Sequence, residues 1–158
     1  MSTALFHGSI TPLPTPYRRD GAEVDTDALR RLVEFQIEGG SHGLSCTGTT
    51  GEPTSLSPEE RRLVIRTVVE AAAGRVPVLA GTGSNWTAET VELSRHAKQV
   101  GADGVLCVAP YHVKPSQQGL FEHFTTIARA IDGLPMMLYN IPGRAGVNIE
   151  PATQKRIH

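Results

Sequence analysis

The chain has 158 residues, of which 39% are hydrophobic and 20% are charged, values that are ordinary for a globular domain with a core. Fifteen basic and sixteen acidic residues leave a formal net charge of −1, which gives no electrostatic reason to expect nucleic acid or an anionic membrane as a partner. No apolar run approaches the roughly 20 residues of a membrane-spanning helix, so we expect one cytoplasmic domain over residues 1–158.

Five short apolar runs are typical of buried parallel strands: residues 8–11, 43–46, 76–80, 104–109 and 135–139. Successive runs begin about 30 residues apart, which is the length of one βα unit. The two cysteines, Cys46 and Cys107, lie within two of these runs, and we interpret them as reduced core thiols rather than as a disulfide.

Amphipathic stretches that predict helices fill the gaps between the runs. The first begins near Asp25 and ends at the glycine pair of residues 39–40. The second has the clearest start signal, because Ser57 can cap it, Pro58 suits its first position and Glu60 completes a capping box. The third is expected after residue 87 and the fourth after residue 116, and a fifth begins at Pro151 and has about two turns up to residue 158.

Two architectures use this repeat: a five-stranded doubly wound sheet and a (β/α)₈ barrel, of which these residues would make about the first five units. Polar residues follow at least four of the predicted strands, at positions 47–52, 82–85, 111–112 and 139–140. In a barrel every strand end faces one site, whereas a doubly wound sheet gathers its site at one switch point. The pattern therefore favours the barrel. A G-x-G-x-x-G signature is absent, since Gly81-Thr82-Gly83 is followed by Ser84, Asn85 and Trp86.

The polar segments suggest candidate site residues. Glycines flank Thr49 and Thr50 in the run GTTGE, where hydroxyls and exposed amides can hold a small carboxylate, although a plain turn explains the run equally well. Tyr139 ends the fifth strand and can pass protons, and Arg144 can bind a carboxylate with two hydrogen bonds. A tyrosine at the rim of the core and a solvated arginine are the alternative interpretation of these two residues. His112 can titrate near neutral pH. The other histidines show no metal-ligand spacing, and we expect neither a metal nor an organic cofactor.

The chain has three lysines, Lys98, Lys114 and Lys155, and none lies on an apolar strand. Imine chemistry needs a lysine whose amine is neutral near pH 7, and burial on a strand is the usual way to obtain one. None of the three has that setting.

Four motifs together resemble the dihydrodipicolinate synthase / N-acetylneuraminate lyase family: GTTGE at 48–52, AGTGSN at 80–85, APYHVKPSQQGL at 109–120 and YNIPGRAG at 139–146. They occur in the order and spacing of that family, and the likeness extends over the whole chain. The resemblance implies a (β/α)₈ barrel, a pyruvate lyase that works through a Schiff-base lysine on the sixth strand, and a homotetramer built as a dimer of dimers.

The resemblance also assigns roles to residues. Thr50 would bind the carboxylate of pyruvate, Thr49 would join a proton relay, and Tyr139 would be the proton donor and acceptor beside the imine. Arg144 would bind the carboxylate of aspartate semialdehyde. The synthases of the family have a second relay tyrosine where this chain has His112, which departs from the pattern.

The sequence therefore predicts a synthase that condenses pyruvate with aspartate semialdehyde in lysine biosynthesis. Two alternatives stay open: a family aldolase that acts on a sugar-derived 2-oxo acid, and a non-catalytic partial barrel, since the family's Schiff-base lysine would lie beyond residue 158.

Overall fold

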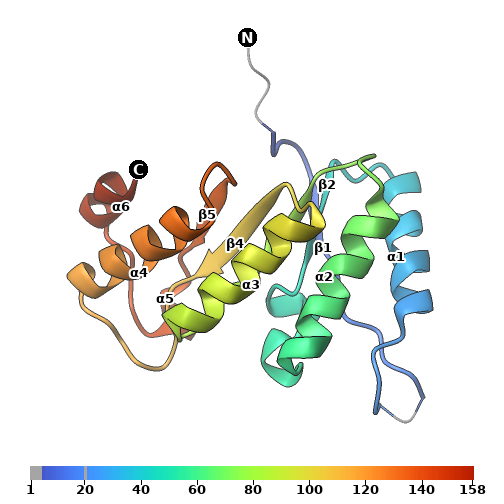
Figure 1. Cartoon of the computed structure of the whole chain (residues 1–158), viewed down its shortest axis with the longest axis horizontal. Coiled ribbons are helices and arrows are strands. Elements are labelled where there is room, and N and C mark those ends of the chain that lie inside the picture. The colour runs from blue at the N-terminus through green and yellow to red at the C-terminus, as the bar shows by residue number, and fades with distance from the viewer. Residues whose placement is uncertain (1–4, 20) are drawn as a thin grey trace.

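Five parallel strands form a single sheet in the computed structural model, which describes residues 5–19 and 21–158 (Figure 1). The strands are β1 (Ile10–Pro12), β2 (Gly43–Cys46), β3 (Val78–Gly81), β4 (Gly104–Val108) and β5 (Met136–Tyr139). Each lies within two residues of a run predicted from the sequence, and the strand β2 has the predicted bounds.

The strands pair in the order β1-β2-β3-β4-β5, so every strand lies beside its neighbours in the chain. A doubly wound sheet would put one strand out of order, as in 2-1-3-4-5. The observed order excludes that alternative and is the order of consecutive strands in a (β/α)₈ barrel. The fold is therefore the N-terminal part of such a barrel, as predicted.

The larger helices cover the sheet in the same order as the strands, side by side across the molecule in Figure 1. They are α1 (Thr26–Glu38), α2 (Pro58–Ala72), α3 (Thr87–Val100), α4 (Gln117–Ala130) and α6 (Pro151–Ile157). Three shorter elements were not predicted: the 3₁₀ turns η1 (Thr49–Gly51) and η2 (Pro53–Ser55), and the single turn α5 (Pro142–Ala145). All three lie at the ends of strands that carry candidate site residues.

The helix starts follow the capping signals in the sequence. Asp25 caps α1 by accepting a hydrogen bond from the amide of Ala28 at 2.8 Å. At the start of α2 the predicted capping box is present, since Glu60 N donates to Ser57 Oγ at 3.2 Å and Ser57 N donates to the Glu60 carboxylate at 2.8 Å. Such caps satisfy amides that have no partner inside the helix.

One apolar core lies between the helices and the sheet. Its largest fully buried side chain is Phe124 of α4. Cys46 and Cys107 are free thiols inside this core, as expected, and burial raises the pKa of Cys46 to about 12 and of Cys107 to about 11. Both thiols are therefore protonated and unreactive at neutral pH. In the described residues, no helix combines the length and apolar character needed to cross a membrane.

A buried histidine joins two of the outer helices. His123 of α4 lies 2.9 Å through Nδ1 from the hydroxyl of Thr87 at the start of α3, and its Nε2 is buried without a hydrogen-bond partner. Burial lowers the pKa of His123 to about 4, because a charged imidazole would lose its hydration there.

This burial predicts a specific loss of stability in acid. The folded-state pKa lies below the unfolded value of about 6.5, so the unfolded chain binds a proton more readily between these values. Lowering the pH from 7 to 4.5 should lower the free energy of unfolding by about 2 kcal/mol through this residue alone. Urea unfolding at both pH values should show a smaller difference for His123→Leu than for the unmodified chain. An equal pH dependence in the two proteins would contradict the assignment.

Candidate functional site

A cavity of about 310 Å³ opens at the carboxyl ends of the strands. Polar groups on its wall come from Thr49, Glu52, Tyr111, Tyr139 and Arg144, while Leu106, Val108 and Ile141 contribute apolar surface. Pockets of this size and mixed character are typical of small-molecule sites. The cavity therefore has hydroxyl groups, a carboxylate and a guanidinium within reach of one small ligand.

The turn after β2 forms one side of the cavity and is bent by two unusual backbone conformations. Thr47 and Glu52 both have φ near 51°, in the left-handed region that residues other than glycine rarely adopt. The hydroxyl of Thr47 lies 2.8 Å from the carbonyl oxygens of Cys46 and Gly81, so it ties the end of β2 to the end of β3. Backbone strain of this kind is found at functional sites, where the surrounding structure maintains it.

Two glycines at the end of β3, Gly81 and Gly83, let neighbouring strands approach closely at the cavity wall. A Cβ atom on Gly81 would collide with the carbonyl oxygen of Thr47. On Gly83 it would lie 2.5 Å from the backbone nitrogen of Val108, at the end of β4. Both glycines line the cavity. The glycines of the GTG run therefore allow the strand ends to pack closely. They are not part of a dinucleotide-binding signature, which the sequence lacks.

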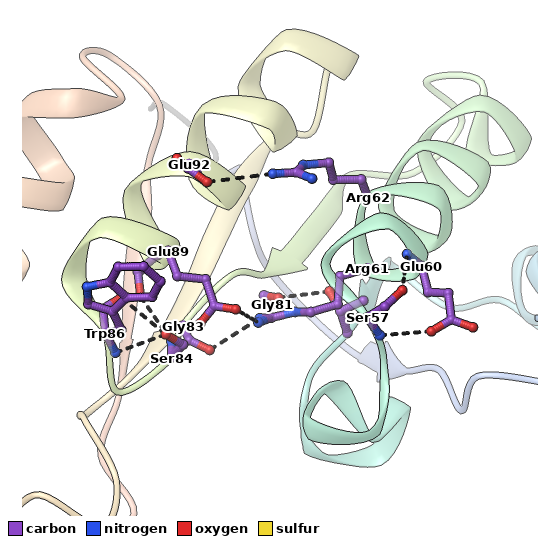
Figure 2. Close-up of polar contacts among 12 residues, drawn as sticks. Ser57, Glu60, Arg61, Arg62, Gly81, Gly83, Ser84, Trp86, Glu89 and Glu92 are labelled. Atoms are coloured by element: carbon purple, nitrogen blue, oxygen red, sulfur yellow. Dashed lines mark hydrogen bonds and ion pairs between the residues drawn. The ribbon is translucent and has the colours of Figure 1, made fainter.

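A buried arginine bonds to the backbone at this wall, as Figure 2 shows for Arg61 and Gly83. Arg61 of α2 donates through Nη2 to the carbonyl oxygen of Gly83 at 3.3 Å, and its Nη1 lies 3.6 Å from the carboxylate of Glu89 on α3. Burial lowers the pKa of Arg61, and the negative charge of Glu89 opposes that shift. The pair links the starts of α2 and α3 to the backbone that lines the cavity.

The structure brings three of the five candidate residues to the cavity: Thr49, Tyr139 and Arg144. Thr50 lies beside Thr49 in η1 and is exposed, but the cavity lining does not include it. His112 is exposed in the loop after β4 with φ of 74°, and it is not part of the lining either. The residue before it, Tyr111, does line the cavity.

None of the three lysines is part of the cavity lining. Lys98 donates to the carbonyl oxygen of Asp132 at 2.6 Å, and Lys114 and Lys155 are exposed, the latter in α6. Among the described residues, no group of three His, Cys, Asp or Glu side chains is placed to hold a metal ion.

Comparison with known proteins identifies the family. The family model described as "Dihydrodipicolinate synthetase family" matches residues 5–158. The chain belongs to this family. It is 56% identical over 153 residues to a 4-hydroxy-tetrahydrodipicolinate synthase of Pelobacter propionicus, a match that covers 97% of this chain and 52% of that protein.

Solved structures of the family have the same fold. The dihydrodipicolinate synthase of Aquifex aeolicus superposes with a TM-score of 0.92 at 47% identity and covers 96% of this chain. That of Acinetobacter baumannii, solved in complex with pyruvate, gives a TM-score of 0.90 at 46% identity and covers 95% of it. In both comparisons the match takes in 51% of the solved chain, so this chain spans about half the length of the family members it matches.

Three residues at or behind the cavity wall were not singled out from the sequence. Tyr111 was included only in the polar positions 111–112, and Glu52 was included only in the GTTGE motif. Arg61 was not considered. Arg61 is one of the buried residues of α2, although arginine side chains are mostly exposed in folded proteins. The sequence feature related to its burial is its acidic partner Glu89, which lies near the start of the next helix.

The close packing at Gly83 generates a stability prediction with a control in the same chain. Gly83→Ala should destabilise the fold by about 1–3 kcal/mol, because the new methyl group meets backbone that cannot move aside. Gly143→Ala should stay within about 0.5 kcal/mol of the unmodified chain, since a methyl group at that position would have no neighbour within 4 Å. Urea denaturation of the two variants tests this. Equal stabilities would mean that the strand ends are not packed as described.

Proposed function

We propose that the whole protein containing this chain is a 4-hydroxy-tetrahydrodipicolinate synthase. It condenses pyruvate with aspartate semialdehyde, using a Schiff base between pyruvate and a lysine of the strand that follows β5 in a complete barrel. The observation that carries the proposal is the meeting of Thr49, Tyr139 and Arg144 at one cavity in a chain of this family.

The chemistry follows from the imine. The lysine amine attacks the keto carbon of pyruvate and water leaves, which gives an imine. Loss of a methyl proton converts the imine into an enamine, whose terminal carbon attacks the aldehyde carbon of the semialdehyde and forms the new carbon–carbon bond. The amino group of the second substrate then displaces the lysine and closes the ring. Each step moves a proton, so the site needs groups that donate and accept protons beside the imine.

The candidate residues supply these functions in the proposal. Tyr139 transfers protons at the imine, with Thr49 as its partner in the relay. Thr50, which lies next to Thr49 in η1, binds the carboxylate of pyruvate, and Arg144 binds the carboxylate of aspartate semialdehyde. Support for the role of Arg144 comes from its place at the cavity, where its guanidinium can pair with a carboxylate through two hydrogen bonds.

His112 favours a second candidate function, an aldolase of the same family that acts on a sugar-derived 2-oxo acid. In the proposal for the synthase, this position contributes to the proton relay of a neighbouring subunit within a homotetramer. An imidazole can perform that task, although it loses its proton several units below a phenol. The exposure of His112 in this chain is compatible with contact to a second subunit.

We further propose that the enzyme acts in the cytoplasm.

Borohydride trapping with labelled pyruvate is the experiment that tests the function. We expect the whole protein to gain one pyruvate adduct, on a lysine outside residues 1–158. The 158-residue chain alone should gain none, because a free lysine has a pKa of about 10.4 and only about one in 2,500 is neutral at pH 7. Intact-mass spectrometry followed by peptide mapping gives the result. A stoichiometric adduct on Lys98, Lys114 or Lys155 would overturn the proposed chemistry, as would the absence of any adduct on the whole protein.

The substitution His112→Tyr separates the relay role from a role specific to histidine. If His112 relays protons, the tyrosine variant of the whole protein should keep its kcat/KM with aspartate semialdehyde or exceed it. A loss of about a hundredfold, equivalent to about 2.7 kcal/mol of barrier, would instead assign histidine a role of its own. Parallel assays with sugar-derived 2-oxo acids show whether the aldolase alternative holds, since an aldolase would cleave them faster than it condenses the semialdehyde.

A further inference from the structure

The segment between β5 and α6 carries Arg144 and is closed by a side chain at its own start. Asn140 follows the last residue of β5. Its Oδ1 accepts a hydrogen bond from the amide of Ile149 at 3.0 Å, and its Nδ2 donates to Oδ1 of Asn148 at 2.8 Å. Because Asn148 and Ile149 lie at the far end of the segment, these two bonds join its ends.

A second side chain holds the same end from outside. Gln117, the first residue of α4, donates through Nε2 to the carbonyl oxygen of Asn148 at 2.8 Å. Its Oε1 accepts from the amide of Glu150 at 3.2 Å and from the hydroxyl of the buried Thr153 at 2.6 Å. Gln117 thereby fixes the segment to α4 and α6 together. We call the side-chain bonds of Asn140 and Gln117 the clasp.

The clasped segment contributes directly to the cavity. Ile141, Arg144 and Ala145 belong to its lining, and Ala145 and Ile149 are 1% exposed. Inside the segment the amide of Ala145 donates to Ile141 O at 2.9 Å, which forms the single turn α5. This turn is too short to be stable by itself, so its position depends on how the segment is closed.

In the described part of the chain, no contact of its own side chain holds Arg144 in place. Across the residues that the structure describes, its guanidinium makes no hydrogen bond or ion pair, and the side chain is exposed. The backbone therefore sets the point from which this side chain extends toward the cavity. Since the clasp fixes that backbone at both ends, it also fixes the reach of Arg144.

We propose that Asn140 and Gln117 are positioning residues, which act through Arg144 to set recognition of the carboxylate on the second substrate. This rests on the proposed function, because the role of Arg144 is part of it. The clasp touches neither Thr49 nor the other residues of η1. Its loss should therefore affect the second substrate and leave pyruvate binding and imine formation unchanged.

The first test uses proteolysis of the whole protein and does not depend on catalysis. Trypsin cleaves after arginine, and cleavage after Arg144 requires α5 to open. Asn140→Ala and Gln117→Ala should each raise the rate of that cleavage about tenfold, while Asn140→Asp, which keeps the acceptor for Ile149 N, should raise it less. Gln118→Ala is the matched control, because the side chain of Gln118 bonds to Glu122 and Arg156, outside the clasp. Cleavage as slow in Asn140→Ala as in the control would overturn the clasp.

The second test uses the whole protein. Asn140→Ala should lower kcat/KM for aspartate semialdehyde about tenfold and leave the rate of pyruvate trapping by borohydride unchanged. In an Arg144→Ala background, adding Asn140→Ala should cost little more, since the two residues act as one unit. Equal losses for both substrates, or fully additive losses, would show that Asn140 does not act through Arg144. A parent protein that traps no pyruvate would overturn the proposed function, while the proteolysis result would still decide whether the clasp exists.

Discussion

The parallel pairing of consecutive strands is the constraint on which the rest of this structure depends. Helices that return the chain over the same face bring every strand back in the same direction, so all carboxyl ends meet at one edge. The register then determines which residues become neighbours: Cys46 pairs with Ala80, Gly81 with Leu106, and Val108 with Tyr139. Residues far apart in the sequence therefore line one cavity, and no further scaffold is needed to gather them.

This edge combines close packing with strain, and the two have a common cause. The ends of β2, β3 and β4 approach until only glycine fits at positions 81 and 83. At the same edge, the backbone of Thr47 takes a left-handed conformation, and its hydroxyl bonds to a neighbouring strand. Each feature lowers stability in isolation. The buried core beneath supplies the stability that lets the strand ends keep a shape suited to binding.

The sequence was most informative where a local rule acts alone. Strand positions, helix starts and the capping box at Ser57 follow from apolar spacing and from chemistry within one turn, and they were predicted correctly. Burial of Arg61 and the exposure of Thr50 depend on how separate elements pack, which no local pattern encodes. Asn140 and Gln117 both lay in recognised motifs, but their contacts could not be predicted from the sequence either. Gln117 bonds to residues 31 or more positions away, and Asn140 closes a loop.

Two arginines beside one cavity differ in how far their charge is already paired within the protein. Arg61 is 4% exposed and paired with Glu89, and it donates to the backbone of the cavity wall, so its charge is already committed within the protein. Arg144 is exposed, and its charge remains available to a ligand. An available guanidinium recognises a carboxylate well only if it is held at the right distance, because a freely moving side chain loses entropy on binding. In the role proposed for Arg144, the amide side chains of Asn140 and Gln117 hold the backbone beneath it, and because they are neutral they do not pair with its charge.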